Sequence, residues 1–185
     1  EKAQNPKTLV VACCDSRVDP AILLHCKPGD LFVIRNVAAL VPAVTQASNP
    51  CSVMSAIEYG VKHLNVEHIV VMGHSHCGGI HGLMTPESIA GETYIQDWVS
   101  IASPALERLQ AMTGDEDEKT RSRHCEEGAV LISLDNLLSY PWIAERVKNG
   151  QLKLHALYYD LSEGNLYRFS PDSEDFELLF HTIEN

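Results

Sequence analysis

Residues 69–79 read Ile-Val-Val-Met-Gly-His-Ser-His-Cys-Gly-Gly, a short apolar run that passes directly into side chains able to bind a metal ion. Residues 9–17, Leu-Val-Val-Ala-Cys-Cys-Asp-Ser-Arg, repeat this design. Short β-branched runs are typical of strands buried on both faces of a parallel sheet. Ligands of open α/β sheets bind beyond the carboxyl ends of such strands. We therefore expect two neighbouring strands to bring both segments to one crevice.

The rest of the chain alternates predicted strands and helices. A helix over residues 52–64 feeds the strand at 69–73, which is a crossover typical of parallel sheets. The other expected elements are a strand at 30–35, helices at 94–112 and 119–138, and strands at 152–160 and 165–169. The predicted fold is α/β: a central, mostly parallel β-sheet flanked by helices, with an antiparallel C-terminal strand pair. Residues 1–185 are expected to form a single domain.

Composition excludes several classes of partner. The chain has 185 residues, of which 45% are hydrophobic, and a net charge of −11. Scattered Lys and Arg residues in an acidic chain disfavour nucleic acid. The apolar runs are far shorter than the roughly 20 residues of a membrane span, and no signal-peptide pattern opens the chain. We expect a protein that is not secreted, and is cytoplasmic or, if a targeting segment preceded Glu1, organellar (chloroplast or mitochondrion).

Six cysteines would permit disulfides in an oxidising compartment. A chain of this length does not need such cross-links, so free thiols or metal ligands are the preferred interpretation. Four of the cysteines are interpreted as small buried apolar residues: Cys14, Cys26, Cys51 and Cys125.

Cys13, His74 and Cys77 are the candidate metal ligands. Zinc accepts thiolate sulfur and imidazole nitrogen, and catalytic zinc sites commonly use three protein ligands and leave one position open. A closed structural site would need a fourth Cys or His at matching spacing, which neither segment offers. The His-x-x-Cys pair alone is weak evidence, but it coincides with a second cysteine at a strand end.

Four motifs in this order resemble the β-class carbonic anhydrases, and specifically their plant-like subclass. They are Cys13-x-Asp15-Ser16-Arg17, Phe32-Val33-Ile34-Arg35-Asn36-Val37, Ala56-Ile57-Glu58-Tyr59 and Gly73-His74-Ser75-His76-Cys77-Gly78-Gly79. The resemblance implies one Zn²⁺ per chain, held by Cys13, His74 and Cys77. It also implies reversible hydration of carbon dioxide to bicarbonate and a proton, by attack of zinc-bound hydroxide.

The same resemblance implies roles for residues around the zinc. Asp15 would accept a hydrogen bond from the nucleophile, and Arg17 would keep Asp15 ionised. The alternatives are a plain salt bridge in a turn, or an Asp15 that moves onto zinc at low pH. Substrate would be bound by Gln4, Phe32, Val37, Tyr59 and Gly78.

Regulation and proton transfer are less defined. The subclass with a regulatory bicarbonate pocket has a Trp three residues before the first Cys ligand, where this chain has Val10. Bicarbonate regulation is therefore not expected. His76 and His81 could transfer protons, or be ordinary surface histidines.

The resemblance also implies a homo-oligomer, either a dimer or an assembly of dimers, although the family's N-terminal helical arm is not expected in this sequence. Two competing functions stay open. One is hydrolysis of carbonyl sulfide or carbon disulfide, which are also linear triatomic molecules. The other is a non-catalytic zinc-binding or bicarbonate-sensing module.

Overall fold

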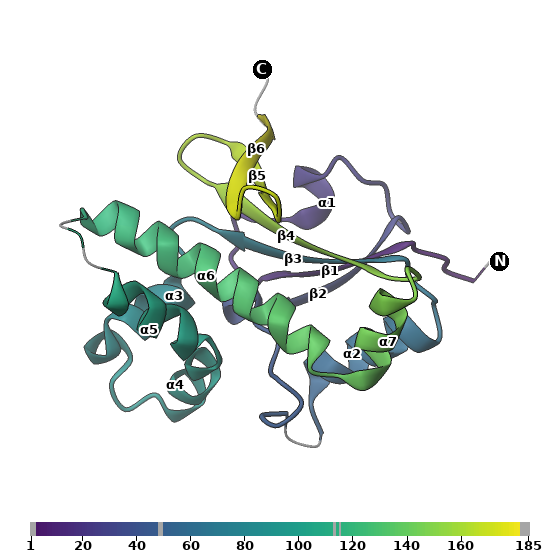
Figure 1. Ribbon diagram of the computed structural model, residues 1–185, viewed down its shortest axis with the longest axis horizontal. Coiled ribbons are helices and arrows are strands. Elements are labelled where there is room, and N and C mark those ends of the chain that lie inside the picture. The colour runs from purple at the N-terminus through teal and green to yellow at the C-terminus, as the bar shows by residue number, and fades with distance from the viewer. Residues whose placement is uncertain (1–2, 48–49, 113, 115, 182–185) are drawn as a thin grey trace.

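The computed structural model describes residues 3–47, 50–112, 114 and 116–181. Its centre is a six-stranded sheet in the order β2-β1-β3-β4-β5-β6 (Figure 1). Strands β1 to β4 pair in parallel, and β5 and β6 add antiparallel strands at one edge. The strands are β1 (Thr8–Cys13), β2 (Leu31–Asn36), β3 (His68–His74), β4 (Lys153–Asp160), β5 (Asn165–Ser170) and β6 (Asp175–His181). The predicted fold class and antiparallel C-terminal pair are confirmed.

The helices cover the two sheet faces unequally. They are α1 (Pro20–Leu23), α2 (Ser52–Lys62), α3 (Gly78–Met84), α4 (Thr93–Val99), α5 (Ser103–Ala111), α6 (Glu118–Leu138) and α7 (Pro141–Lys148). Helices α2, α6 and α7 pack on one face and the short α1 on the other (Figure 1). Alternation along β1 divides its side chains between these cores: Leu9 and Val11 face α2 and α6, whereas Val10 and Ala12 face α1.

Several elements differ from the sequence prediction, among them the short helix α1, which lies in a stretch where no helix was expected. The expected helix at 94–112 is two helices, α4 and α5, joined by a 3-10 turn at Ser100–Ala102. Pro104 lies in the first turn of α5, because proline lacks the N–H that a helix interior requires. Helix α7 and strand β6 were not predicted. Strand β6 follows an acidic turn. Its apolar residues Phe176, Leu178 and Phe180 alternate along the strand, but this short pattern was not recognised next to the acidic residues.

A left-handed backbone segment follows β2. Ala38 has φ 62° and Ala39 has φ 55°, in a region that normally favours glycine. Each such alanine costs about 1–2 kcal/mol. The segment is nevertheless buried, since Ala38 and Ala39 are 6% and 0% exposed. Packing and hydrogen bonds from neighbouring elements must therefore offset the strain.

The cysteine prediction is partly wrong. Cys125 is fully buried, but Cys14 is exposed and Cys26 and Cys51 are only half-buried. Because side chains alternate along an extended chain, the residue after the buried Cys13 points outward. No disulfide occurs within the described part of the chain, which contains all six cysteines.

Among the described residues, no helix has the length and apolar character needed to cross a membrane.

These environments predict the order in which thiols react. In the native protein, Cys14 should be alkylated by iodoacetamide first, and Cys125 should stay unmodified because burial raises the pKa of its thiol to about 11. Peptide mass spectrometry after timed alkylation would measure this order. After metal removal and denaturation without reductant, all six thiols should react. Modification of native Cys125 before Cys14, or fewer than six thiols after denaturation, would contradict the assignment.

Candidate metal centre

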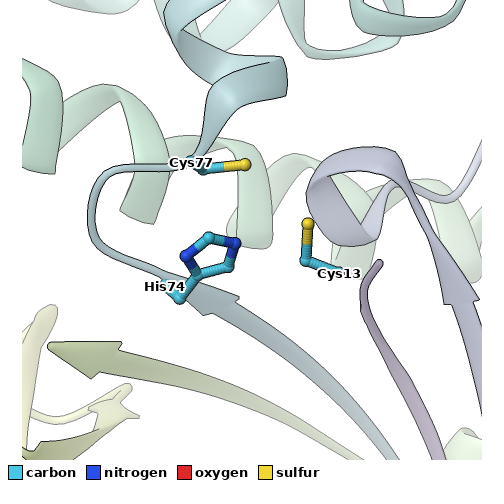
Figure 2. Close-up of side chains that lie close together, drawn as sticks. All are labelled: Cys13, His74 and Cys77. Carbon is cyan, nitrogen blue, oxygen red and sulfur yellow. The ribbon is translucent and has the colours of Figure 1, made fainter. Parts of the chain in front are cut away.

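Three side chains converge where neighbouring parallel strands end. Cys13 is the last residue of β1 and His74 the last of β3, while Cys77 directly precedes α3. Strands β1 and β3 pair in register, with Ala12 opposite Met72, so both carboxyl ends lie at one edge of the sheet. The two sulfur atoms and a ring nitrogen lie within 4.8 Å of one another, and all three residues are buried (Figure 2). The structure thus brings together the predicted ligand set.

His74 is oriented for coordination. Its Nδ1 atom donates to the Ser75 carbonyl oxygen at 2.8 Å, which leaves the lone pair on Nε2. Nε2 is buried and is the one buried side-chain N or O atom, among the described residues, without a hydrogen-bond partner. A buried polar atom without a partner is costly unless something satisfies it. A metal ion between His74 and the two sulfur atoms would do so.

Cys13 and Cys77 influence one another strongly. Hydrogen bonding from the Cys77 thiol lowers the pKa of Cys13 to about 4, against the effect of burial. The same contact, together with burial, raises the pKa of Cys77, because a second thiolate so close would be repelled. A divalent cation removes this repulsion and can hold both residues as thiolates.

The donor set fits zinc. Two thiolates balance the charge of Zn²⁺, and sulfur with imidazole nitrogen is the combination this borderline-soft ion prefers. The surroundings are apolar: Cys13 and Cys77 belong to a buried cluster with Leu40, Ile80 and Ala129. Three protein ligands leave one position for a small molecule.

Asp15 and Arg17 form a two-pronged ion pair beside the ligands. Arg17 Nε donates to Asp15 Oδ1 at 2.9 Å, and Nη2 donates to Oδ2 at 2.7 Å. These bonds hold the pKa of the Asp15 carboxyl well below its usual range, although its partial burial opposes them. Asp15 Oδ2 lies 4.0 Å from His74 Nε2, on the side of the ligand atoms. Asp15 is therefore ionised and lies beside the candidate ligand atoms.

The loop carrying Asp15 is fixed by Arg35, which the sequence prediction left without a role. Its Nε donates to the carbonyl oxygen of Cys13 at 2.9 Å. Its Nη2 donates to the carbonyl oxygens of Asp15 at 2.6 Å and Val18 at 2.8 Å. These bonds shape the turn after β1. No sequence pattern predicts which carbonyl groups an arginine will contact.

Glu126 is a second contributor that sequence reasoning missed. This buried carboxylate on α6 accepts the Cys77 N–H at 3.0 Å and the Tyr158 hydroxyl at 2.7 Å. Burial raises the pKa of Glu126, and these two hydrogen bonds partly offset that rise. No sequence signal separates Glu126 from the adjacent Glu127.

The predicted substrate residues separate into two groups. Val37 packs on the cluster around Cys13 and Cys77, and Gly78 begins α3 directly after Cys77. Phe32 pairs with Leu9, which lies four residues before Cys13 on β1. At ~3.3 Å per residue, Phe32 is therefore displaced by roughly 13 Å along the strands from Cys13.

Tyr59 lies beside Phe32, with ring centroids 6.1 Å apart, and is 46% exposed. Gln4 is exposed and precedes the start of β1, whereas Cys13 ends that strand. One chain therefore does not gather Gln4, Phe32 and Tyr59 around its own ligand atoms.

His76 and His81, the candidate proton carriers, are both exposed.

Substitution by alanine should affect stability very differently at two adjacent glycines. A Cβ on Gly79 would lie 2.6 Å from Val37 Cγ1 and 3.1 Å from Ala38 Cβ, whereas a Cβ on Gly78 would meet nothing within 4 Å. Gly79→Ala should therefore lower the free energy of unfolding by about 1–3 kcal/mol. Gly78→Ala should change it by less than about 0.5 kcal/mol. Urea titration of both metal-free variants at one protein concentration would compare them. Equal losses would contradict the close approach of α3 to the loop after β2.

Comparisons with known proteins agree on one family. The sequence model of a family described as carbonic anhydrase matches residues 8–166. The chain is 42% identical over 171 residues to beta carbonic anhydrase 5, chloroplastic, of Arabidopsis thaliana, covering 92% of this chain and 56% of that protein. It is 40% identical over 178 residues to beta carbonic anhydrase 6, mitochondrial, of the same plant, covering 94% and 61%. The chain thus spans less than two thirds of the length of these curated relatives.

Solved structures give the same result. The β-carbonic anhydrase CcaA superposes with a TM-score of 0.90 at 30% identity, covering 95% of this chain and 85% of that chain. A tetrameric β-carbonic anhydrase from Sordaria macrospora superposes with a TM-score of 0.75 at 32% identity, covering 91% and 82%.

Proposed function

Because this chain belongs to the carbonic anhydrase family, as a plant-like member of its β class, we propose that it catalyses the reversible hydration of carbon dioxide to bicarbonate and a proton, with one zinc ion per chain. The observation that carries the proposal is the convergence of Cys13, His74 and Cys77 around an unsatisfied His74 Nε2. An ionised Asp15 beside this group provides the polar contact that hydration chemistry needs.

Each residue has a distinct task in this proposal. Zinc, when bound, supplies Lewis-acid activation of water near neutral pH, which is its general role in carbonic anhydrases. The Asp15 carboxylate accepts a hydrogen bond from the attacking water and so orients its lone pair toward the carbon of carbon dioxide. Arg17 keeps that carboxylate ionised and turned toward the site. The Gly78 N–H is a donor for a substrate oxygen, and Val37 supplies an apolar wall.

We also propose that the protein acts as a homo-oligomer, either a dimer or an assembly of dimers. Phe32 and Tyr59 lie far from the ligand atoms of their own chain, next to the sheet edge formed by β2, where Val33 is 40% exposed. If these aromatic residues bind substrate, they must do so from a second copy. Light scattering after size exclusion should give an even number of chains. A monomer with full activity would contradict this arrangement.

The relatives' names place them in the chloroplast and the mitochondrion. We propose a cytoplasmic or organellar location for this protein, which imaging of the full-length protein fused to a fluorescent marker would test. Localisation to the secretory pathway would contradict it.

Stopped-flow measurement of carbon dioxide hydration tests the activity. The zinc-loaded protein should hydrate carbon dioxide at slightly alkaline pH. Removal of zinc with a chelator should abolish this activity, and added zinc should restore it. Carbonyl sulfide and carbon disulfide should be turned over much more slowly. No zinc-dependent hydration, or a preference for either sulfur compound, would overturn the proposal.

A further inference from the structure

We infer that Asn36 is a positioning residue for the metal centre: its side-chain amide clamps the loop 36–40 so that the Ala38 N–H stays on the Cys13 sulfur. The inference rests on the proposed zinc site but concerns a residue that does not touch the metal. Asn36 ends β2, next to β1, and its backbone carbonyl accepts the Cys14 N–H at 2.9 Å. The clamp is thus attached directly to the strand that carries Cys13.

The amide of Asn36 binds both backbone groups of one residue. Its Oδ1 accepts the Leu40 N–H at 2.8 Å, and its Nδ2 donates to the Leu40 carbonyl oxygen at 3.0 Å. This pair of bonds closes the five-residue loop 36–40. Leu40 is completely buried, so its backbone groups cannot exchange these bonds for water.

The closed loop contains the strained alanines. Ala38 and Ala39 both have left-handed backbone conformations that alanine rarely adopts. This conformation directs the Ala38 N–H to Cys13 Sγ, at 3.4 Å. It also sets Val37 and Ala38 against Gly79, two residues after the ligand Cys77. Without the Asn36 amide the loop would relax toward ordinary conformations, and its N–H would leave the sulfur.

Side chains of α4 and α6 hold the backbone at Val37 and Val41, on either side of the two strained alanines. Trp98 Nε1 donates to the Val37 carbonyl oxygen at 2.8 Å, and Asn136 Nδ2 donates to the Val41 carbonyl oxygen at 2.8 Å. Ser133 Oγ accepts the Val41 N–H at 3.2 Å. These bonds anchor the loop to α4 and α6. The turn between the anchors is shaped by Asn36.

The N–H bond to sulfur has a chemical consequence. A hydrogen bond to a thiolate withdraws electron density from it, so the sulfur donates less charge to a bound metal. It also fixes the direction of the sulfur lone pairs. In a site with two thiolates, both effects keep the metal a stronger Lewis acid and hold it in one geometry. The Asp15 N–H makes the same kind of bond to Cys13 Sγ, at 3.4 Å, from the other side.

Cobalt(II)-substituted protein gives a direct test. Asn36→Leu removes the amide with little change in size. Asn136→Leu is the matched control, because it removes an amide bond to Val41, the residue directly after the loop, and leaves the two bonds to Leu40 in place. We expect Asn36→Leu to shift the sulfur-to-cobalt charge-transfer band and the visible ligand-field bands. We also expect this variant to release zinc to a chelator about 10- to 100-fold faster, while Asn136→Leu matches the parent in both measurements.

The outcomes separate the two proposals. The proposed role of Asn36 is wrong if Asn36→Leu has the cobalt spectrum and the zinc-release rate of the parent. It is also wrong if Asn136→Leu changes both measurements as much as Asn36→Leu does. In either case the proposed metal site is unaffected. If the parent binds neither cobalt nor zinc, the proposed metal site fails and the clamp with it.

A measurement on the unmodified chain covers the case in which Asn36→Leu does not fold. In cadmium-113-loaded parent protein, the amide proton of Ala38 should show scalar coupling to cadmium through the hydrogen bond to sulfur. Coupling from the Cys13 β-protons without any from Ala38 would overturn the inference.

Discussion

Cys77→Ala should abolish zinc-dependent hydration of carbon dioxide and leave well below one zinc ion per chain. The substitution removes one of the two proposed thiolate ligands, and the methyl group of alanine cannot coordinate a metal. It also leaves His74 Nε2 and Cys13 in a buried site with no cation to satisfy them. Stopped-flow assays and atomic emission spectrometry of the purified variant would measure activity and zinc content.

Cys14→Ala is the matched control for this experiment. Cys14 is adjacent to Cys13 in the sequence, but it is exposed and lies outside the cluster of ligand atoms. Its zinc content and rate should equal those of the parent. Retention of zinc by Cys77→Ala, or loss of zinc by Cys14→Ala, would show that the ligand set is wrong.

Asp15→Asn should lower kcat by about 100-fold, the scale of loss when a reacting group is poorly oriented, while zinc stays bound. The amide keeps the size of the carboxylate but can donate as well as accept, so it no longer imposes one orientation on the attacking water. Its bonds to Arg17 also lose their charge assistance. Rates measured across pH, with zinc content determined in parallel, would test this. A rate within about threefold of the parent would reduce Asp15 and Arg17 to a salt bridge in a turn.

The pH dependence of the parent follows from the same ion pair. The folded-state pKa of Asp15 lies well below its ordinary value, so the pair contributes stability above that ordinary value and loses it as pH falls through the folded pKa. Asp15 therefore stays ionised through the neutral range. Protonation of Asp15 should therefore not lower the rate just below neutral pH, and the ratio of the parent rate to the Asp15→Asn rate should stay constant there.

Arg17→Lys separates charge from geometry. Lysine keeps the positive charge but cannot make the paired Nε and Nη2 bonds that Arg17 makes to the two Asp15 oxygens. Its rate should lie between those of the parent and Asp15→Asn. A rate equal to that of the parent would mean that charge alone positions Asp15.

The convergence of Cys13, His74 and Cys77 could be predicted because Cys13 and His74 each directly follow a short apolar run, and Cys77 lies three residues after His74. Parallel pairing of β1 and β3 then makes the two ends meet. The same reasoning failed for Cys14, since alternation along the chain places neighbours of a buried residue outside. It also failed for the helix at 94–112, where Pro104 interrupts an otherwise helical pattern.

The supporting residues could not be predicted, because their roles depend on contacts between distant segments. Glu126 reaches the Cys77 N–H across 49 residues of sequence. Asn36 contacts only its own loop, but that loop depends on left-handed backbone conformations at Ala38 and Ala39. An alanine in the sequence does not indicate such a conformation. Phe32 and Tyr59 were identified by motif alone, and one chain does not explain their place in a pocket.

X-ray absorption at the zinc K-edge, on zinc-loaded protein at neutral pH, tests the open three-ligand site most directly. We expect two sulfur neighbours, one imidazole nitrogen and one further light atom from solvent. A first shell with fewer than two sulfur atoms, or with a carboxylate oxygen from Asp15 in the fourth position, would contradict it.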